Sequence, residues 1–176
     1  MKVSTIRELL VLAEETWGDG VVIRYKSGKS TVAEKSYTDL RKDSEHFSDL
    51  LETLKVRGGH VALIGPTSYE WILSYFGTVN SGSVAVPLDA SLPAADVCEL
   101  VDRADAVVLV ADEARKDVLE AARIQCPKLR YLISMQKTED GDGILALPKL
   151  MEMTLEEMEP GTGARADLQP DQLASI

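Results

Sequence analysis

An aspartate that follows a short apolar run is the residue of this sequence best placed to contact a ligand. Asp89 comes after the run VAV at residues 84–86 and the pair Pro87-Leu88. Open α/β sheets bind ligands outside the carboxyl ends of their strands, so a carboxylate here could contact a substrate or a cation. An Asp after Pro-Leu more often accepts hydrogen bonds from the amides of its own turn. The sequence favours the turn interpretation and leaves ligand contact as the alternative.

Two glycine-containing segments are candidates for binding phosphate. The segment GPTS at residues 65–68 links an expected strand to an expected helix, and helix N-termini bind anions. The pair Gly58-Gly59 is the second candidate. The sequence has neither the G-x-x-x-x-G-K-[ST] pattern of a P-loop nor G-x-G-x-x-G after a strand. Residues 65–68 are therefore expected to form an ordinary strand-to-helix turn.

The histidines and cysteines do not form a recognisable reactive or metal-binding pattern. His46 is expected on the polar side of a helix and His60 at the start of a strand, and neither has a Cys or carboxylate at metal-ligand spacing. Cys98 and Cys126 have no adjacent His or cationic partner, so both are expected to be small buried apolar residues.

Carboxylates near the ends of expected helices have structural explanations. Asp102 and Asp105 flank the end of one helix, and Asp112-Glu113 begins another, where acidic residues cap the helix or complement its dipole. No serine lies in a G-x-S-x-G pattern. The sequence therefore predicts no catalytic, cofactor-binding or metal-binding residue within this chain.

Composition indicates one folded domain or large subdomain that does not bind polyanions. The chain has 176 residues, of which 45% are hydrophobic and 27% charged, and its net charge is -10. A surface for nucleic acid or anionic membrane needs clustered Lys and Arg, so the charge argues against both. The N-terminus lacks an apolar signal segment, and no run approaches the ~18 apolar residues of a membrane helix. Two distant cysteines suit a reduced, cytoplasmic protein.

The order of the expected elements predicts an α/β fold with three layers. Two strands joined by a turn form an N-terminal β-hairpin, and strand-helix units then repeat four times. This alternation is typical of a mostly parallel sheet with helices on both faces. Strands are expected over residues 21–25, 31–35, 60–65, 84–86, 106–111 and 130–134, and helices over residues 5–16, 36–55, 67–82, 93–103, 113–124 and 147–153.

Capping residues mark where these helices begin and end. Capping boxes are predicted for three residue pairs, namely Thr5 with Glu8, Ser36 with Asp39, and Thr67 with Glu70. Gly58-Gly59 is expected to end the second helix and Gly82 to end the third in a left-handed conformation. Pro87 should stop its strand because it has no N–H, and Pro93 suits the first position of the next helix. The buried face of the third helix is predicted to consist of Trp71, Ile72, Tyr75 and Val79.

The chain is expected to divide into two parts. Residues 1–153 form the α/β subdomain, with a polar loop at 137–144. Residues 154–176 form an acidic linker containing Gly and Pro, and Ser175-Ile176 would begin an apolar strand that this chain does not complete.

Three segments resemble the AMP-forming acyl-CoA synthetase and ligase superfamily. They are SYTDL at residues 36–40, HVALIGPTSYEW at 60–71, and residues 77–93, which contain SGSVAVPLD. The resemblance covers residues 21–176 and implies the N-terminal portion of such an enzyme. It also implies a reaction in which a carboxylic acid and ATP, with Mg²⁺, give an acyl-adenylate and pyrophosphate, after which CoA takes the acyl group. The wording of residues 81–89 favours a long-chain fatty acid as substrate.

The resemblance also implies what this chain lacks. The family's Ser/Thr/Gly-rich phosphate loop, its adenine and ribose site and its C-terminal lysine have no counterpart here. The chain by itself is therefore expected to be inert, and to self-associate through a sheet edge that awaits the next strand. The alternatives are a free-standing α/β ligand-binding or regulatory module and, less favoured, half of a nucleotide-dependent oxidoreductase.

Overall fold

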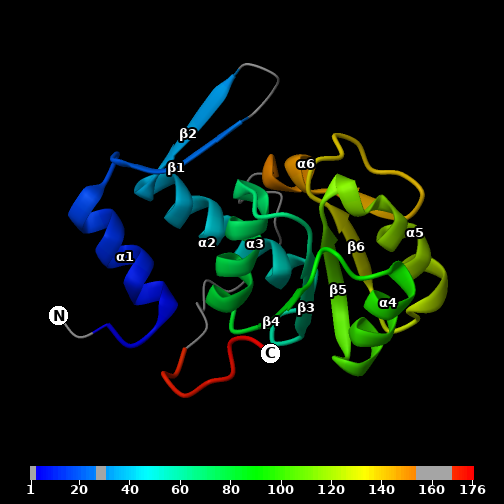
Figure 1. The fold of residues 1–176 in the computed structure, drawn as a ribbon. Helices are drawn as coiled ribbons and strands as arrows, with labels where there is room; N and C mark the ends of the chain where they lie inside the picture. The colour runs from blue at the N-terminus through cyan, green and yellow to red at the C-terminus, as the bar shows by residue number, and fades with distance from the viewer. Residues whose placement is uncertain (1–2, 27–30, 154–167) are drawn as a thin grey trace.

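A parallel sheet forms the centre of the molecule. The computed structural model describes residues 3–26, 31–153 and 168–176. Within them, five parallel strands lie in the order β4-β3-β5-β6-β7 (Figure 1). Their bounds are β3 (His60–Ile64), β4 (Val84–Leu88), β5 (Ala106–Ala111), β6 (Tyr131–Ser134) and β7 (Ile144–Ala146).

Helices cover both faces of this sheet, so the predicted three-layer α/β fold is confirmed. Alternate residues of each strand enter two separate apolar clusters, for example Val61 and Leu63 in one and Ala62 and Ile64 in the other. The first cluster packs against α2 (Tyr37–Thr53), α3 (Tyr69–Asn80) and α6 (Leu147–Met151). The second packs against α4 (Ala94–Arg103) and α5 (Lys116–Gln125), which follows the short 3-10 turn η1 (Glu113–Arg115).

The N-terminal elements form a unit beside the sheet. Helix α1 (Ile6–Trp17) precedes the antiparallel hairpin of β1 (Val21–Lys26) and β2 (Val32–Ser36), which is a sheet of its own. The hairpin projects from the body of the molecule near the start of α2 (Figure 1). The predicted hairpin is confirmed, and its connecting residues 27–30 lie outside the described part of the chain.

Two of the three predicted capping boxes are confirmed. The side chains of Thr5 and Ser36 accept hydrogen bonds from the backbone N–H of the third helical residue, and Glu8 and Asp39 complete the boxes. The third prediction is wrong, because the N-cap of α3 is Ser68, whose Oγ accepts from Trp71 N at 3.2 Å. The turn after β3 extends through Thr67, so the helix begins one residue later than the sequence pattern indicates.

The prediction that α3 ends at Gly82 is confirmed, whereas the prediction that α2 ends at Gly58-Gly59 is wrong. Gly82 has φ +77°, and Gly82 and Ser83 donate to the carbonyls of Val79 and Thr78, which is a Schellman end. Helix α2 ends at Thr53, before Gly58-Gly59, and Lys55 adopts the left-handed conformation with φ +56°. The next residue along the chain, Val56, is buried in the core. Burial of that side chain therefore fixes the turn at a position without glycine.

Pro87 does not stop its strand, contrary to the prediction. On β4, Ala85 N donates to Ala174 O and Ile176 N donates to Ala85 O, so Ala85 faces away from β3. Because the backbone direction alternates along a strand, Pro87 faces the same way and its missing N–H disrupts no bond to β3. Pro93 is the N-cap of α4 and not its first residue.

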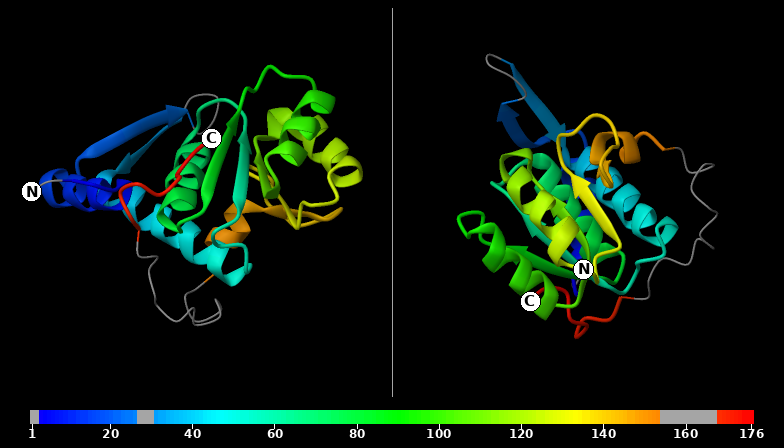
Figure 2. Two further views of the ribbon diagram at one scale, coloured as in Figure 1. Left: turned by 90° about the horizontal axis from the view of Figure 1, so that it is seen from below. Right: turned by 90° about the vertical axis from the view of Figure 1, so that its right-hand side faces the viewer.

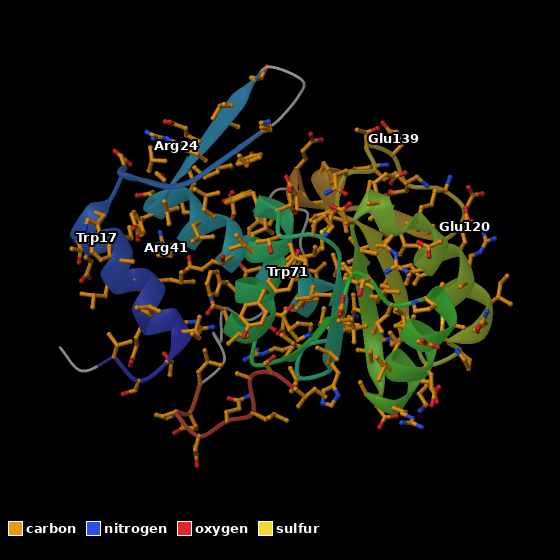
Figure 3. All side chains as sticks on the ribbon, in the orientation of Figure 1. Trp17, Arg24, Arg41, Trp71, Glu120 and Glu139 are labelled. Carbon is orange, nitrogen blue, oxygen red and sulfur yellow. The ribbon has the colours of Figure 1, made fainter. Side chains whose placement is uncertain are left out.

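Of the buried face predicted for α3, Val79 is buried, whereas Trp71, Ile72 and Tyr75 are only half-buried. Leu73, Ser74 and Gly77 are buried, and a Cβ on Gly77 would lie 2.8 Å from the carbonyl oxygen of Ser44 on α2. Trp71, which is labelled in Figure 3, stacks on Tyr75 with ring centroids 5.6 Å apart. The absence of a side chain at Gly77 therefore makes room for the buried Phe47 of α2 between the two helices.

Two short segments extend the sheet at its ends. The expected loop at residues 137–144 runs directly into β7, which pairs with β6 and which the sequence analysis missed. At the other end, Ser175 forms a parallel bridge with Ala85, and the C-terminal segment runs alongside β4 (Figure 2). The strand that was expected to begin at residues 175–176 corresponds to this bridge. Residues 154–167 of the expected linker lie outside the described residues.

Candidate functional site

The carboxyl edge of the parallel sheet is the place to test for a ligand site. Strand β3 is followed by Gly65, β4 by Asp89 and β5 by Asp112. Strands β4 and β5 lie on opposite sides of β3, so the connections from neighbouring strands diverge between β3 and β5. Such a switch point is where open α/β sheets leave a crevice for a ligand.

In this chain, the side chain of Asp112 fills the switch point. Its Oδ1 accepts a hydrogen bond from Ala114 N at 2.8 Å, and its Oδ2 accepts one from Gln136 Nε2 at 2.7 Å. The side-chain Oε1 of Gln136 accepts in turn from Glu113 N at 2.8 Å. Asp112 is 8% exposed, so the carboxylate is a buried cap of η1, as its sequence position predicted. We call Asp112, Glu113 and Gln136 the edge latch.

Gly65 is required by the edge latch and not by a phosphate. It has φ +147°, and a Cβ at this position would lie 2.4 Å from the Cβ of Asp112. The N–H of Asp112 also donates to the carbonyl of Ile64 at 2.9 Å. Close packing against Asp112 therefore accounts for a glycine at this position of the turn.

Asp89 forms a turn at the exposed rim of the same edge. Its Oδ1 accepts hydrogen bonds from both Ser91 N, at 2.8 Å, and Ser91 Oγ, at 2.7 Å. These two hydrogen bonds hold the pKa of the Asp89 carboxyl below its ordinary value, so it is an exposed anion at neutral pH. The turn interpretation is confirmed for Asp89.

Arg115 joins the loops that follow β4 and β5, and the sequence analysis did not single it out. Its Nη1 donates to Ala90 O at 2.6 Å, and its guanidinium pairs with Asp117 at 3.0 Å. The Arg115 side chain is only 12% exposed. The pKa of Asp117 is lowered by this hydrogen-bonded partner. No sequence signal marks the contact, because Ala90 is 25 residues away.

The second phosphate candidate lies at the opposite, amino edge of the sheet. Gly58 has φ +77° and donates its N–H to Ser83 Oγ at 2.9 Å. A Cβ on Gly59 would lie 2.6 Å from the side chain of Val107. The adjacent Arg57 donates to Ser81 O and to Glu52. The glycines are thus explained by a turn and by close packing.

The histidines are not brought together with other possible metal ligands. The Nδ1 of His60 contacts the carbonyl oxygen of Ala104. His46 is half-buried on α2 and not on a fully exposed polar face, and its Nε2 has no hydrogen-bond partner among the described residues. Within the part of the chain that the structure describes, no three His, Cys, Asp or Glu residues could hold a metal ion.

The cysteines have the structural role expected of them, whereas Asp102 and Asp105 form ion pairs in place of the expected cap or dipole interaction. Cys98 and Cys126 are buried. Asp102 and Asp105 near the end of α4 form ion pairs with Lys128, at 3.1 and 2.8 Å. These pairs, led by the hydrogen bond from Lys128, lower the pKa of Asp105. The described helices include none that could cross a membrane.

Comparisons with known proteins identify the family. The AMP-binding enzyme family matches residues 13–176. Long-chain-fatty-acid–CoA ligase FadD13 of Mycobacterium tuberculosis strain H37Rv is 28% identical over 97 residues, which are 54% of this chain and 19% of that protein. Crotonobetaine/carnitine–CoA ligase of Salmonella paratyphi A is 30% identical over 79 residues, which are 44% and 15% of the two chains.

Solved structures share the fold over almost the whole chain. The anthranilate CoA ligase AuaEII, solved with anthranoyl-AMP, has a TM-score of 0.80 and 19% identity, and the match covers 97% of this chain and 30% of that one. Coronafacic acid ligase from Pectobacterium brasiliense has a TM-score of 0.81 and 15% identity over 98% and 33% of the two chains. The chain spans about a fifth or less of the two curated relatives. Because the family match runs from residue 13 to residue 176, this chain belongs to the AMP-binding enzyme family.

Proposed function

We propose that this chain forms the N-terminal part of the large domain of an AMP-forming acyl-CoA ligase. In that reaction a carboxylate attacks the α-phosphorus of ATP, pyrophosphate leaves, and the thiol of CoA displaces AMP from the acyl-adenylate. The family match over residues 13–176 carries the proposal, and relatives named as CoA ligases support the thiol acceptor.

The part played by this chain is to form a wall of the enzyme. The two hydrogen bonds that the Asp112 carboxylate accepts within the chain support a structural role for this residue at the carboxyl edge. Asp89 uses one oxygen in its own turn. The edge latch and Arg115 hold the loops after β4 and β5 in fixed positions. Binding of ATP, Mg²⁺ and CoA would then depend on residues beyond this chain.

The substrate we propose is a fatty acid, and the cellular location is the cytoplasm. The resemblance of residues 81–89 to long-chain fatty acid ligases supports the substrate, as does the name of one curated relative. The absence of adjacent reactive cysteines, and two buried free thiols, suit a reducing compartment.

The test compares this chain with a longer protein that contains it. Each is incubated with ATP, Mg²⁺, radiolabelled pyrophosphate and a carboxylic acid, from acetate to palmitate, and label entering ATP is measured. We expect exchange with the longer protein, strongest for fatty acids, and none with residues 1–176 alone. Exchange by the short chain would contradict its inertness. No exchange by the longer protein with any acid would contradict the ligase and favour a ligand-binding module.

A further inference from the structure

Two cysteines from different helices meet on the face of the sheet that α4 and α5 cover. Cys98 lies within α4, and Cys126 is the residue that ends α5. The Sγ of Cys126 lies 3.7 Å from the carbonyl oxygen of Cys98, as a thiol that donates to it. The two residues are 28 positions apart in sequence, so the fold alone brings them together.

The surroundings of this pair are apolar. Both residues are 5% exposed and belong to the cluster that includes Val97, Val101 and Ala122. Burial, together with a hydrogen bond between the two side chains, raises the pKa of Cys126 to about 12. The Cys126 thiol is therefore protonated, and both sulfurs are shielded while α4 and α5 stay packed, so they do not behave as exposed reactive cysteines.

The proximity of the two cysteines determines which oxidation product forms once an oxidant reaches one of the two sulfurs. An oxidised cysteine passes through a sulfenic acid, which a nearby thiol converts to a disulfide before further oxygen is added. At this site the nearest thiol belongs to the other cysteine of the pair. Opening of α4 from α5 controls access, so the reaction would be slow and would respond to sustained exposure.

We propose that Cys98 and Cys126 are a redox-modification site, at which a peroxide forms a reversible intramolecular disulfide that locks α4 to the end of α5. One thiol attacks the peroxide oxygen, giving a sulfenic acid and water when the peroxide is hydrogen peroxide. The second thiol then attacks that sulfur, and a second water leaves as the S–S bond forms. Two thiols and one hydrogen peroxide thus give one disulfide and two waters, and a dithiol reverses the reaction.

The lock would act on the carboxyl edge of the sheet. Helix α4 follows the loop of Asp89 and Ala90, and α5 follows η1, whose Arg115 holds that loop through Ala90. A covalent bond between the two helices would therefore limit relative movement of the loops after β4 and β5. This inference does not depend on the proposed ligase activity.

The experiment maps the sulfur chemistry of the full chain after exposure to hydrogen peroxide. The protein is unfolded, remaining thiols are alkylated, and the digest is analysed by mass spectrometry. We expect a cross-linked peptide pair containing Cys98 and Cys126, two hydrogens lighter than the separate peptides and absent after treatment with dithiothreitol. The oxidised protein should also melt about 5–10 °C higher, because the cross-link restricts the unfolded chain.

Single variants separate the paired reaction from ordinary oxidation. Cys98→Ala and Cys126→Ala each keep a small apolar side chain, and in each the remaining sulfur should gain oxygen atoms without forming the bond. Two free thiols in the wild type, after an exposure that oxidises methionines of the same sample, would overturn the proposal. Disulfides formed only between molecules, or sulfinic acids in place of the cross-link, would overturn it as well. The mass-spectrometric analysis of the wild-type protein tests the proposal even if neither variant folds.

Discussion

Two helices of this protein end in the same backbone conformation with different residues. Gly82 follows α3 with φ +77°, and Lys55 follows α2 with φ +56°. Each donates its backbone N–H back to the last turn of its helix, to Val79 and Glu52 respectively. Glycine adopts this conformation without steric cost, whereas a residue with a Cβ does not. The protein is therefore relaxed at one helix end and strained at the other.

Opposite substitutions at these two residues should have opposite effects. Gly82→Val should lower the free energy of unfolding by about 1–2 kcal/mol or more, because a branched side chain is forced to a positive φ. Lys55→Gly should raise it by up to about 1 kcal/mol, because the same strain is removed. Urea denaturation of both variants measures the difference. An unchanged midpoint for Gly82→Val would show that the left-handed end is not required.

The capping box of Ser36 and Asp39 joins β2 to α2 and carries a predictable pH dependence. Asp39 accepts hydrogen bonds from Ser36 N and Oγ, each at 2.9 Å. These bonds, the backbone one first, hold the pKa of Asp39 below its ordinary value. A lowered pKa in the folded state gives stability that is present above the unfolded value near pH 4 and is lost as the pH falls through the folded pKa.

Removing the cap should therefore matter more at neutral than at acid pH. Ser36→Ala should cost about 0.5–2 kcal/mol at pH 7, because the start of α2 loses its side-chain acceptor and Asp39 loses a donor. Part of this difference should disappear as the pH falls from about 4, the unfolded pKa of an aspartate, through the lower pKa of folded Asp39. Ser48→Ala, in the middle of the same helix, is the control and should show no such pH dependence. Thermal melts between pH 3 and pH 7 measure both, and a penalty independent of pH would refute the role of Asp39.

At the scale of the whole molecule, one edge of the sheet is incompletely covered. Strand β4 lies at the end of the five-stranded sheet, and its outer side is paired through Ala85 with residues 174–176. Nearby, Leu173 and Ile176 are 54% and 56% exposed. An edge with free backbone groups and apolar neighbours is a template for pairing with a second chain. The missing N–H of Pro87 works against such pairing.

We expect residues 1–176 to self-associate through this edge when studied as a separate chain. Sedimentation velocity over a range of concentrations should show a monomer at low concentration and larger species at high concentration. Leu173→Lys places a charge beside the edge without altering β4, and should weaken the association. A single monomeric species at every concentration would contradict the prediction. Association that Leu173→Lys leaves unaltered would place the contact elsewhere on the surface.

The sequence by itself determined the features that depend on near neighbours along the chain. The alternation of apolar strands and helices predicted the parallel sheet and its two helical layers. The boxes at Thr5 and Ser36, the turn of Asp89 with Ser91 and the left-handed end at Gly82 each join residues at most five apart, so local preferences suffice. The turn of Asp89, which is one part of the candidate site, was therefore predictable from the sequence.

Tertiary structure decided the features that join distant residues. The edge latch depends on Gln136, 24 residues from Asp112, and the packing of α2 on α3 depends on the contact between Phe47 and Gly77. The helix end at Lys55 follows from burial of the neighbouring Val56. Such outcomes are set by which surfaces exclude water and which atoms have room. Both effects arise only where elements pack against each other, so no short segment of sequence encodes them.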